Sequence, residues 1–227
     1  MIFYKTQAMR KCLNLMTCEA YMQSCMRDSA HDAEHVYRVL NYALDIAAHE
    51  SNINLEILSA ACLLHDVGQI EQLTDPAIDH AVHGAEMAYA WLTENGYSNE
   101  FAGKVKECIR THRYRSSDPP RSNEAKILFD ADKVDACGAI GMARVLFCTA
   151  QLGEPLYTLD ENDWVSDGTD DESPSFFREY KFKLENMYDR FYTRRGAELA
   201  GNRKAAARNF YEALLREARE CYLNAEC

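Results

Sequence analysis

The residues best suited to chemistry are histidines that stand near carboxylates in separate stretches of the chain. His65 is followed directly by Asp66, His35 comes three residues after Asp32, and Asp132 lies inside an apolar run. One histidine on a helix is more often structural than functional, but several on different helices beside carboxylates favour a metal site. Imidazole with carboxylate suits Mn, Fe, Co, Ni or Zn at an open site, whereas thiolates would indicate a closed structural zinc.

The His65-Asp66 pair ends an apolar stretch, and Gly68 follows as a residue fit to terminate a helix. Two strongly solvated side chains at the end of a buried helix cost stability unless something coordinates or pairs them. The helix dipole explains the histidine in this place but not the aspartate. A bound metal accounts for both.

Asp32 and Arg38 flank His35 at helical spacing. Ser29, three residues before Asp32, is a helix-start pattern in which the hydroxyl caps the first amides. His35 then falls in the first turns of the helix, with Arg38 one turn further along the same face. Asp32, one turn earlier, is placed to accept the second imidazole N–H of His35 and fix its tautomer.

Three aspartates, Asp130, Asp132 and Asp135, interrupt the apolar stretch 127–136, with Lys133 among them. Asp132 and Asp135 share one face of a helix there, and Lys133 points about 100° away from Asp132. Carboxylates in such apolar surroundings are seldom without a role.

The elements that position these residues read as helices. Apolar residues recur at spacings of three and four, strand-like alternation is nearly absent, and the chain has only 10 glycines and 5 prolines. The sequence therefore predicts an all-α protein. The expected helices cover residues 36–47, 54–66, 80–95, 99–113, 122–151, 175–194 and 196–224.

We expect three parts along the chain. Residues 1–153 form the metal-binding core with an N-terminal helix, ended by Gly153 and Pro155. Residues 154–174 form an exposed acidic loop, whose carboxylates lack the spacing of a calcium-binding loop. Residues 175–227 form C-terminal helices that pack on the core.

Composition sets limits on the function. The net charge of −11 argues against general nucleic-acid binding, which needs clustered Lys and Arg. It does not exclude a small phosphorylated substrate, because a bound cation reverses the field within a pocket. No apolar run is long enough to predict a transmembrane helix, and the N-terminal stretch does not have the pattern of a signal peptide. The nine cysteines include no CxxC pair. We expect a cytoplasmic protein with buried, reduced cysteines, as a monomer or homodimer.

Taken together, these elements resemble the HD phosphohydrolase superfamily, named for its His…His-Asp…Asp pattern. The likeness is greatest to a bacterial subgroup of nucleotide pyrophosphatase-like members, and it extends over about residues 29–150. It implies an HD-domain helical bundle with an additional C-terminal helical segment. The stretches that carry it are Asp32–Val39, Leu63–Gly68, His80–Ala85, Ile109–His112 and Asp130–Ala136.

The resemblance implies a divalent ion (Mn, Mg, Co, Ni, Fe or Zn) and assigns residue roles. His80 and His112 match positions that bind a second metal in binuclear members and face the substrate phosphate in mononuclear ones. His83 has no family role, and Asp130 and Asp135 are supporting acids. The predicted metal ligands are His35, His65, Asp66 and Asp132. The predicted catalytic residues are Asp66, Lys133, Arg38 and Glu71. The predicted substrate-binding residues are Lys133, His80, His112 and Arg38.

One position departs from the family pattern. In nucleotidase relatives the third residue after the HD aspartate can be a glutamate that helps to activate water, and here it is Gln69. A glutamine cannot take a proton, so another acid must do so, Glu71 and Asp75 being nearest, unless the metal activates the water unaided.

The implied reaction is metal-assisted hydrolysis of a phosphate ester or anhydride, with a nucleotide or (deoxy)nucleoside triphosphate as substrate and pyrophosphate as one possible product. Two alternatives remain open. An HD-fold di-iron oxygenase would use six ligands, completed by His80 and His112. A non-catalytic nucleotide-binding module would keep the fold without turnover, although such modules usually lose a ligand.

Overall fold

The computed structural model describes residues 13–26, 33–113 and 118–223. The expected helix start at Ser29 and the expected contact of Asp32 lie outside the described residues. All of the predicted metal ligands lie inside them.

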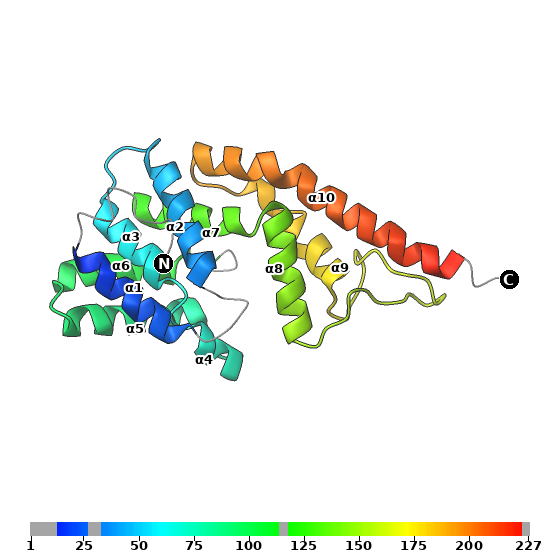
Figure 1. Ribbon diagram of the computed structural model, residues 1–227, viewed down its shortest axis with the longest axis horizontal. Helices are drawn as coiled ribbons and strands as arrows, with labels where there is room; N and C mark the ends of the chain where they lie inside the picture. The colour runs from blue at the N-terminus through cyan, green and yellow to red at the C-terminus, as the bar shows by residue number, and fades with distance from the viewer. Residues whose placement is uncertain (1–12, 27–32, 114–117, 224–227) are drawn as a thin grey trace. The chain divides into compact units, whose positions relative to one another are not determined.

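The described residues form helices and no β-sheet, which confirms the prediction of an all-α protein. The only bridge between extended segments of the described chain joins Leu159 and Val165. The elements, of which Figure 1 labels the α-helices, are α1 (Leu13–Cys25), α2 (Ala33–Ala47), α3 (Leu55–Leu64), α4 (Gln69–Thr74), α5 (His80–Glu94), α6 (Asn99–Arg110), α7 (Asn123–Asp135), α8 (Gly138–Gln151), α9 (Phe176–Glu179), η2 (Tyr180–Leu184), η3 (Met187–Asp189) and α10 (Arg194–Leu223).

The chain forms two compact units, Met1–Asp132 and Lys133–Cys227, and the boundary falls inside α7. The first unit contains α1 to α6 and most of α7, and the second contains α8 to α10. The expected division of the sequence after residues 153 and 174 stays a prediction.

Helix α3 is the centre of the first unit. Every residue from Ile57 to Leu64 is buried, and α1, α2 and α6 pack around this helix. A helix that is apolar on all sides is stable only inside a protein. Asn54 caps its first turn by accepting hydrogen bonds from the amides of Glu56 and Ile57. The last residues of the helix therefore lie in the interior of the unit.

The turn after α3 packs directly against α5 through two glycines. A Cβ atom on Gly68 would lie 2.6 Å from the backbone nitrogen of Gly84 and 2.8 Å from the carbonyl oxygen of His80. Only two residues without side chains allow this approach of backbone to backbone. The contact sets the distance between the turn that carries Asp66 and the first residue of α5.

Side-chain caps fix where α5 and α6 begin. The Asp79 carboxylate accepts hydrogen bonds from the amides of Ala81 and Val82, so α5 starts at His80. Ser98 accepts a hydrogen bond from the amide of Phe101 at the start of α6. Caps of this kind satisfy amides that have no partner within the helix.

The single helix expected over residues 122–151 is wrong. Helix α7 ends at Asp135, Cys137 is extended, and α8 begins at Gly138, whose φ is +72°. Positive φ favours glycine, and a Cβ atom on Gly138 would lie only 2.8 Å from the Cβ atom of Arg203. The apolar periodicity continues across the break, and therefore hides it in the sequence.

The helix expected over residues 175–194 is also replaced by shorter pieces. Helix α9 passes into the π-helical η2 and then the 3₁₀ turn η3 before α10 begins. Within this unit the ring of Tyr180 stacks on Tyr211 of α10, with ring centroids 4.0 Å apart. The side chains of Phe176 and Phe177 are fully buried. Aromatic packing, rather than helical periodicity, sets the backbone path here.

Two helices have bounds that the sequence does not predict. Helix α1 lies in the N-terminal stretch, where a helix was expected without stated ends. Among its residues whose side chains the structure describes, Leu15, Cys18 and Met22 are buried and most others are exposed, a stripe too narrow to locate the helix. Helix α4 was not expected, because its six residues are too few for a periodic pattern. Among the described helices, none combines the length and the apolar character needed to cross a membrane.

We predict that Gly68→Ala destabilises the metal-free protein by about 1–3 kcal/mol, because the added methyl group meets the backbone of α5. Gly103→Ala is the matched control. Gly103 lies inside α6, and a methyl group there would meet open space in the described part of the chain, so alanine should stabilise the protein by about 0.5–1 kcal/mol. Denaturant unfolding measures both. Equal effects of the two substitutions would contradict the close-packed turn.

Candidate metal centre

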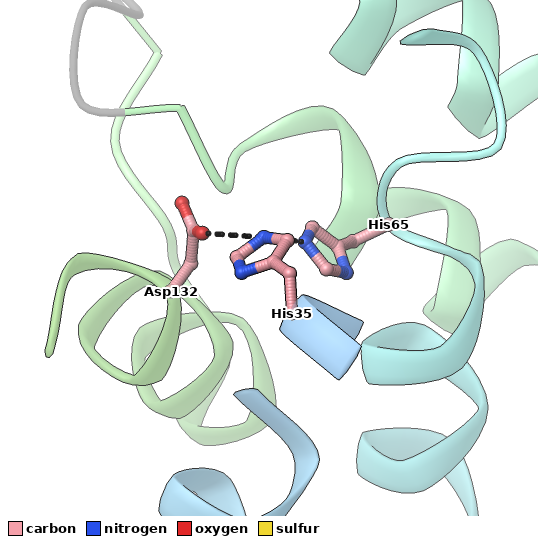
Figure 2. A group of neighbouring side chains, drawn as sticks. All are labelled: His35, His65 and Asp132. Atoms are coloured by element: carbon pink, nitrogen blue, oxygen red, sulfur yellow. Dashed lines mark hydrogen bonds and ion pairs between the residues drawn. The ribbon is translucent and has the colours of Figure 1, made fainter. Parts of the chain in front are cut away.

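The first ligand group lies among the helices of the first unit. Figure 2 shows the His35 ring between the His65 ring and the Asp132 carboxylate. The Nε2 atom of His35 lies 3.3 Å from Nε2 of His65 and 3.4 Å from Oδ1 of Asp132. Three ligand atoms of these residues lie within 4.8 Å of one another. Two ring nitrogens facing each other repel unless a proton or a cation lies between them.

The second ligand group consists of Asp66, His80 and His112, whose ligand atoms also lie within 4.8 Å of one another. The Nε2 atoms of His80 and of His112 are each 3.6 Å from Oδ1 of Asp66. His80 is the first residue of α5, and His112 follows the end of α6.

Asp66 stands between the two groups. Its Oδ1 faces His80 and His112, and its Oδ2 lies 3.5 Å from Nε2 of both His35 and His65. The four predicted ligands of one ion are therefore neighbours, and the same carboxylate also serves the pair that the sequence suggested for a second ion. A carboxylate can place one oxygen on each of two metal ions.

Three of the imidazoles have their second nitrogen engaged. Nδ1 of His65 is 2.8 Å from the carbonyl oxygen of Cys62, and Nδ1 of His112 is 2.6 Å from that of Ile109. A carbonyl only accepts, so each Nδ1 donates and each Nε2 is left with its lone pair. This orientation by a second contact is typical of histidines that ligate metals. Nδ1 of His80 is held by a side chain, Gln72.

Burial and charge act on the centre in opposite directions. Burial by itself raises the pKa of the Asp66 carboxyl, but the imidazoles of His65, His112 and His35 outweigh it and hold that pKa well below its ordinary value. Burial lowers the pKa of His65, and it lowers the pKa of His80 to about 4. An ionised carboxylate and neutral imidazoles are the forms that bind a metal.

His112 differs from the other rings. Burial opposes its charge, but the hydrogen bond to Asp66 and the Asp66 charge raise the pKa of its imidazole. A proton on this ring and a metal ion are alternative partners for the same carboxylate, so metal binding here releases a proton.

The donor set fits a divalent metal ion. His35, His65, Asp66 and His112 are at most 7% exposed, and their nitrogens and oxygens converge. Buried polar groups of this number are costly unless a cation or protons join them. Imidazole nitrogen with carboxylate oxygen suits Mn, Fe, Co, Ni and Zn.

Lys133 is held within the second unit. Its ammonium donates a hydrogen bond to the carbonyl oxygen of Arg190 and lies 4.3 Å from the centroid of the Phe191 ring. The side chain is only 3% exposed. Its position is thus fixed by a backbone acceptor and an aromatic face. Its predicted role at a phosphate stays a prediction.

The other predicted residues take varied places. Arg38 is half-buried on α2, three residues after His35. Glu71 lies on α4, and its Oε2 is buried without a hydrogen-bond partner among the described residues. His83 belongs to neither ligand group of the described residues. Asp135 is fully buried and pairs with Arg144 at 3.1 Å, a contact that links α7 to α8.

Sequence reasoning missed Gln72. It lies six positions after Asp66 on a short helix that the sequence does not predict. No spacing pattern points to it, because its contact with His80 is made across a turn between α4 and α5.

Comparison with known proteins identifies a family for the part of the chain that carries these residues. Residues 32–137 match the family described as "HD domain". The chain is 33% identical over 144 residues to the uncharacterized protein YpgQ of Bacillus subtilis, a match that covers 60% of this chain and 67% of that protein. The crystal structure of YpgQ in complex with ADP is similar with a TM-score of 0.68 and 26% identity, over 90% of this chain and 97% of that one.

Two further proteins are similar. The crystal structure of a predicted HD superfamily hydrolase from an uncultured Thermotogales bacterium has a TM-score of 0.62 at 26% identity, over 93% of this chain and 97% of that one. The 3′-5′ exoribonuclease YhaM of Halalkalibacterium halodurans is 28% identical over 119 residues, which are 46% of this chain and 37% of that protein.

We predict that His80 lowers the stability of the metal-free protein as the pH falls from 7 to 5, compared with a variant that lacks this imidazole. Between pH 6.5 and about 4 the unfolded chain binds a proton at His80 that the folded chain does not, so the free energy of unfolding falls as pH is lowered through this window. The share of His80 is about 2 kcal/mol. Denaturant unfolding at both pH values measures it, and His80→Gln should flatten the slope. An unchanged slope in that variant would refute the assignment.

Proposed function

This chain belongs to the HD superfamily of hydrolases, and on that premise we propose that it is a metal-dependent phosphohydrolase acting on a nucleotide. The observation that carries the proposal is the Asp66 carboxylate, whose two oxygens each face two imidazole nitrogens. The ADP complex of YpgQ supports a nucleotide as ligand, because that relative is similar over 90% of this chain. A phosphate anhydride of a nucleoside triphosphate is the bond that we expect to be cleaved.

In the proposed enzyme, His35, His65, Asp66 and Asp132 would hold one divalent ion, and His80 and His112 with Asp66 would hold a second. A bound ion would polarise a phosphoryl oxygen and lower the pKa of a water molecule. The chain's own part is to aim the ring nitrogens inward, through the carbonyl oxygens that fix the Nδ1 atoms of His65 and His112. We favour manganese among the ions that suit this donor set.

Lys133 and Arg38 are the proposed phosphate contacts. The Lys133 ammonium is fixed by Arg190 and Phe191, and a charge that is already in place needs no reorganisation when a substrate develops negative charge. Arg38 is half-buried on the same helix as His35, and its guanidinium can bind two phosphoryl oxygens at once.

Glu71 is the proposed proton acceptor. Gln69 cannot take a proton, whereas one carboxylate oxygen of Glu71 is buried and lacks a hydrogen-bond partner within the described parts of the chain. Such an oxygen is available to accept a proton from an attacking water molecule.

A second candidate function is favoured by the same six ligands. Six residues, among them the Asp66 carboxylate that both groups share, also suit an HD-fold di-iron oxygenase. Two bound irons together with oxygen consumption would support that reaction and remove the hydrolase.

We predict that the protein releases phosphate or pyrophosphate from at least one nucleotide in the presence of Mn, Mg, Co or Ni. A panel of nucleotides assayed with each metal measures this directly. Asp66→Ala should abolish turnover, because it removes the carboxylate shared by both ligand groups. The helical circular dichroism spectrum of this variant should be unchanged. Release of neither product from any nucleotide would overturn the proposed reaction.

We also predict that Lys133→Met lowers kcat/KM by about 10²-fold or more, since a fixed charge at a developing oxyanion contributes on this scale. Lys126→Met, which removes a charge from the same helix, is the control and should leave kcat/KM near the wild-type value. Steady-state kinetics on the best nucleotide measures both variants. A wild-type value for Lys133→Met would exclude the lysine from the substrate site.

A further inference from the structure

Gln72 reaches the first residue of α5 from the neighbouring helix α4. Its side-chain oxygen Oε1 is 3.2 Å from the backbone nitrogen of His80 and 2.5 Å from Nδ1 of the same residue. A backbone N–H can only donate, so the atom that it meets must be the amide oxygen rather than the amide nitrogen. The Nδ1 atom therefore also donates to this oxygen, and the lone pair of the His80 ring is left on Nε2.

The need for Gln72 follows from the place of His80 in its helix. His65 and His112 each follow a helix, and both bind a carbonyl oxygen three residues earlier in the chain. His80 begins a helix, and no turn of α5 precedes it. The acceptor for its Nδ1 must come from another element, and α4 supplies it.

The same oxygen serves the helix as well. The first amides of a helix have no partner within it, and Asp79 already accepts from the amides of Ala81 and Val82. Gln72 accepts from the amide of His80. Backbone and ring of His80 are thus both held by one side chain, which leaves Nε2 directed at Oδ1 of Asp66, 3.6 Å away.

We propose that Gln72 is the positioning residue of His80, and that it sets the affinity of the group Asp66, His80 and His112 for a divalent cation. The group of His35, His65 and Asp132 does not depend on it. This inference rests on the metal centre of the proposed function but not on the reaction catalysed there. Loss of a contact that orients a ligand histidine weakens metal binding by about 10–100-fold.

Manganese titration of the metal-free, full-length protein tests the proposal. Calorimetry gives the binding constants, and electron paramagnetic resonance distinguishes two spin-coupled ions from a single one. Gln72→Met has a similar length and lacks the amide oxygen, its sulfur being only a weak acceptor, whereas Gln72→Glu keeps an acceptor oxygen in the same place. Thr74→Ala, on the same helix and exposed, is the matched control.

We expect two binding events in the wild type and in Thr74→Ala. In Gln72→Met the weaker event should lose about 10–100-fold in affinity and the coupled signal should disappear, while the tighter event is unchanged. Gln72→Glu should restore both events.

Three results would overturn the proposal. They are a single manganese ion in the wild type, an unchanged second event in Gln72→Met, and an equal loss of both events in that variant. None of these readouts depends on turnover. Two intact binding events without hydrolysis of any nucleotide would instead remove the proposed reaction and leave the role of Gln72 standing.

Discussion

A carboxylate enclosed by imidazoles is the constraint that the helices of the first unit have to meet. Asp66 is 7% exposed, and both of its oxygens face ring nitrogens within 3.6 Å. A buried charge is tolerated only where opposite charge and hydrogen bonds compensate it. The rings that provide this compensation must be aimed from outside the centre. Helix-end carbonyls aim two of them, and a glutamine on a separate helix aims His80.

The surrounding helices serve this requirement. Helix α3, buried on all sides, carries the His-Asp pair into the interior, and the Gly68–Gly84 contact brings α5 close enough for His80 to reach the same carboxylate. A methyl group at either glycine would separate these elements. The polar centre therefore depends on the apolar helix, because helix packing keeps polar side chains close together that would otherwise separate.

Much of this arrangement could be predicted from the sequence. His65, Asp66 and Asp132 stand out because they are polar residues in apolar runs, and helical periodicity locates α2, α3, α5 and α6. The break between α7 and α8 could not be predicted, because it depends on a positive φ at Gly138 that the apolar pattern does not record. Gln72 and the sharing of Asp66 were also out of reach. A sequence indicates the ligands, but the tertiary fold decides which oxygen faces which ring.

Anomalous diffraction from crystals of the manganese-loaded protein tests the central claim most directly. We expect two manganese peaks on either side of the Asp66 carboxylate, one bound by His35, His65 and Asp132, and the other by His80 and His112. A single peak, or two peaks that leave Asp66 uncoordinated, would contradict the shared carboxylate.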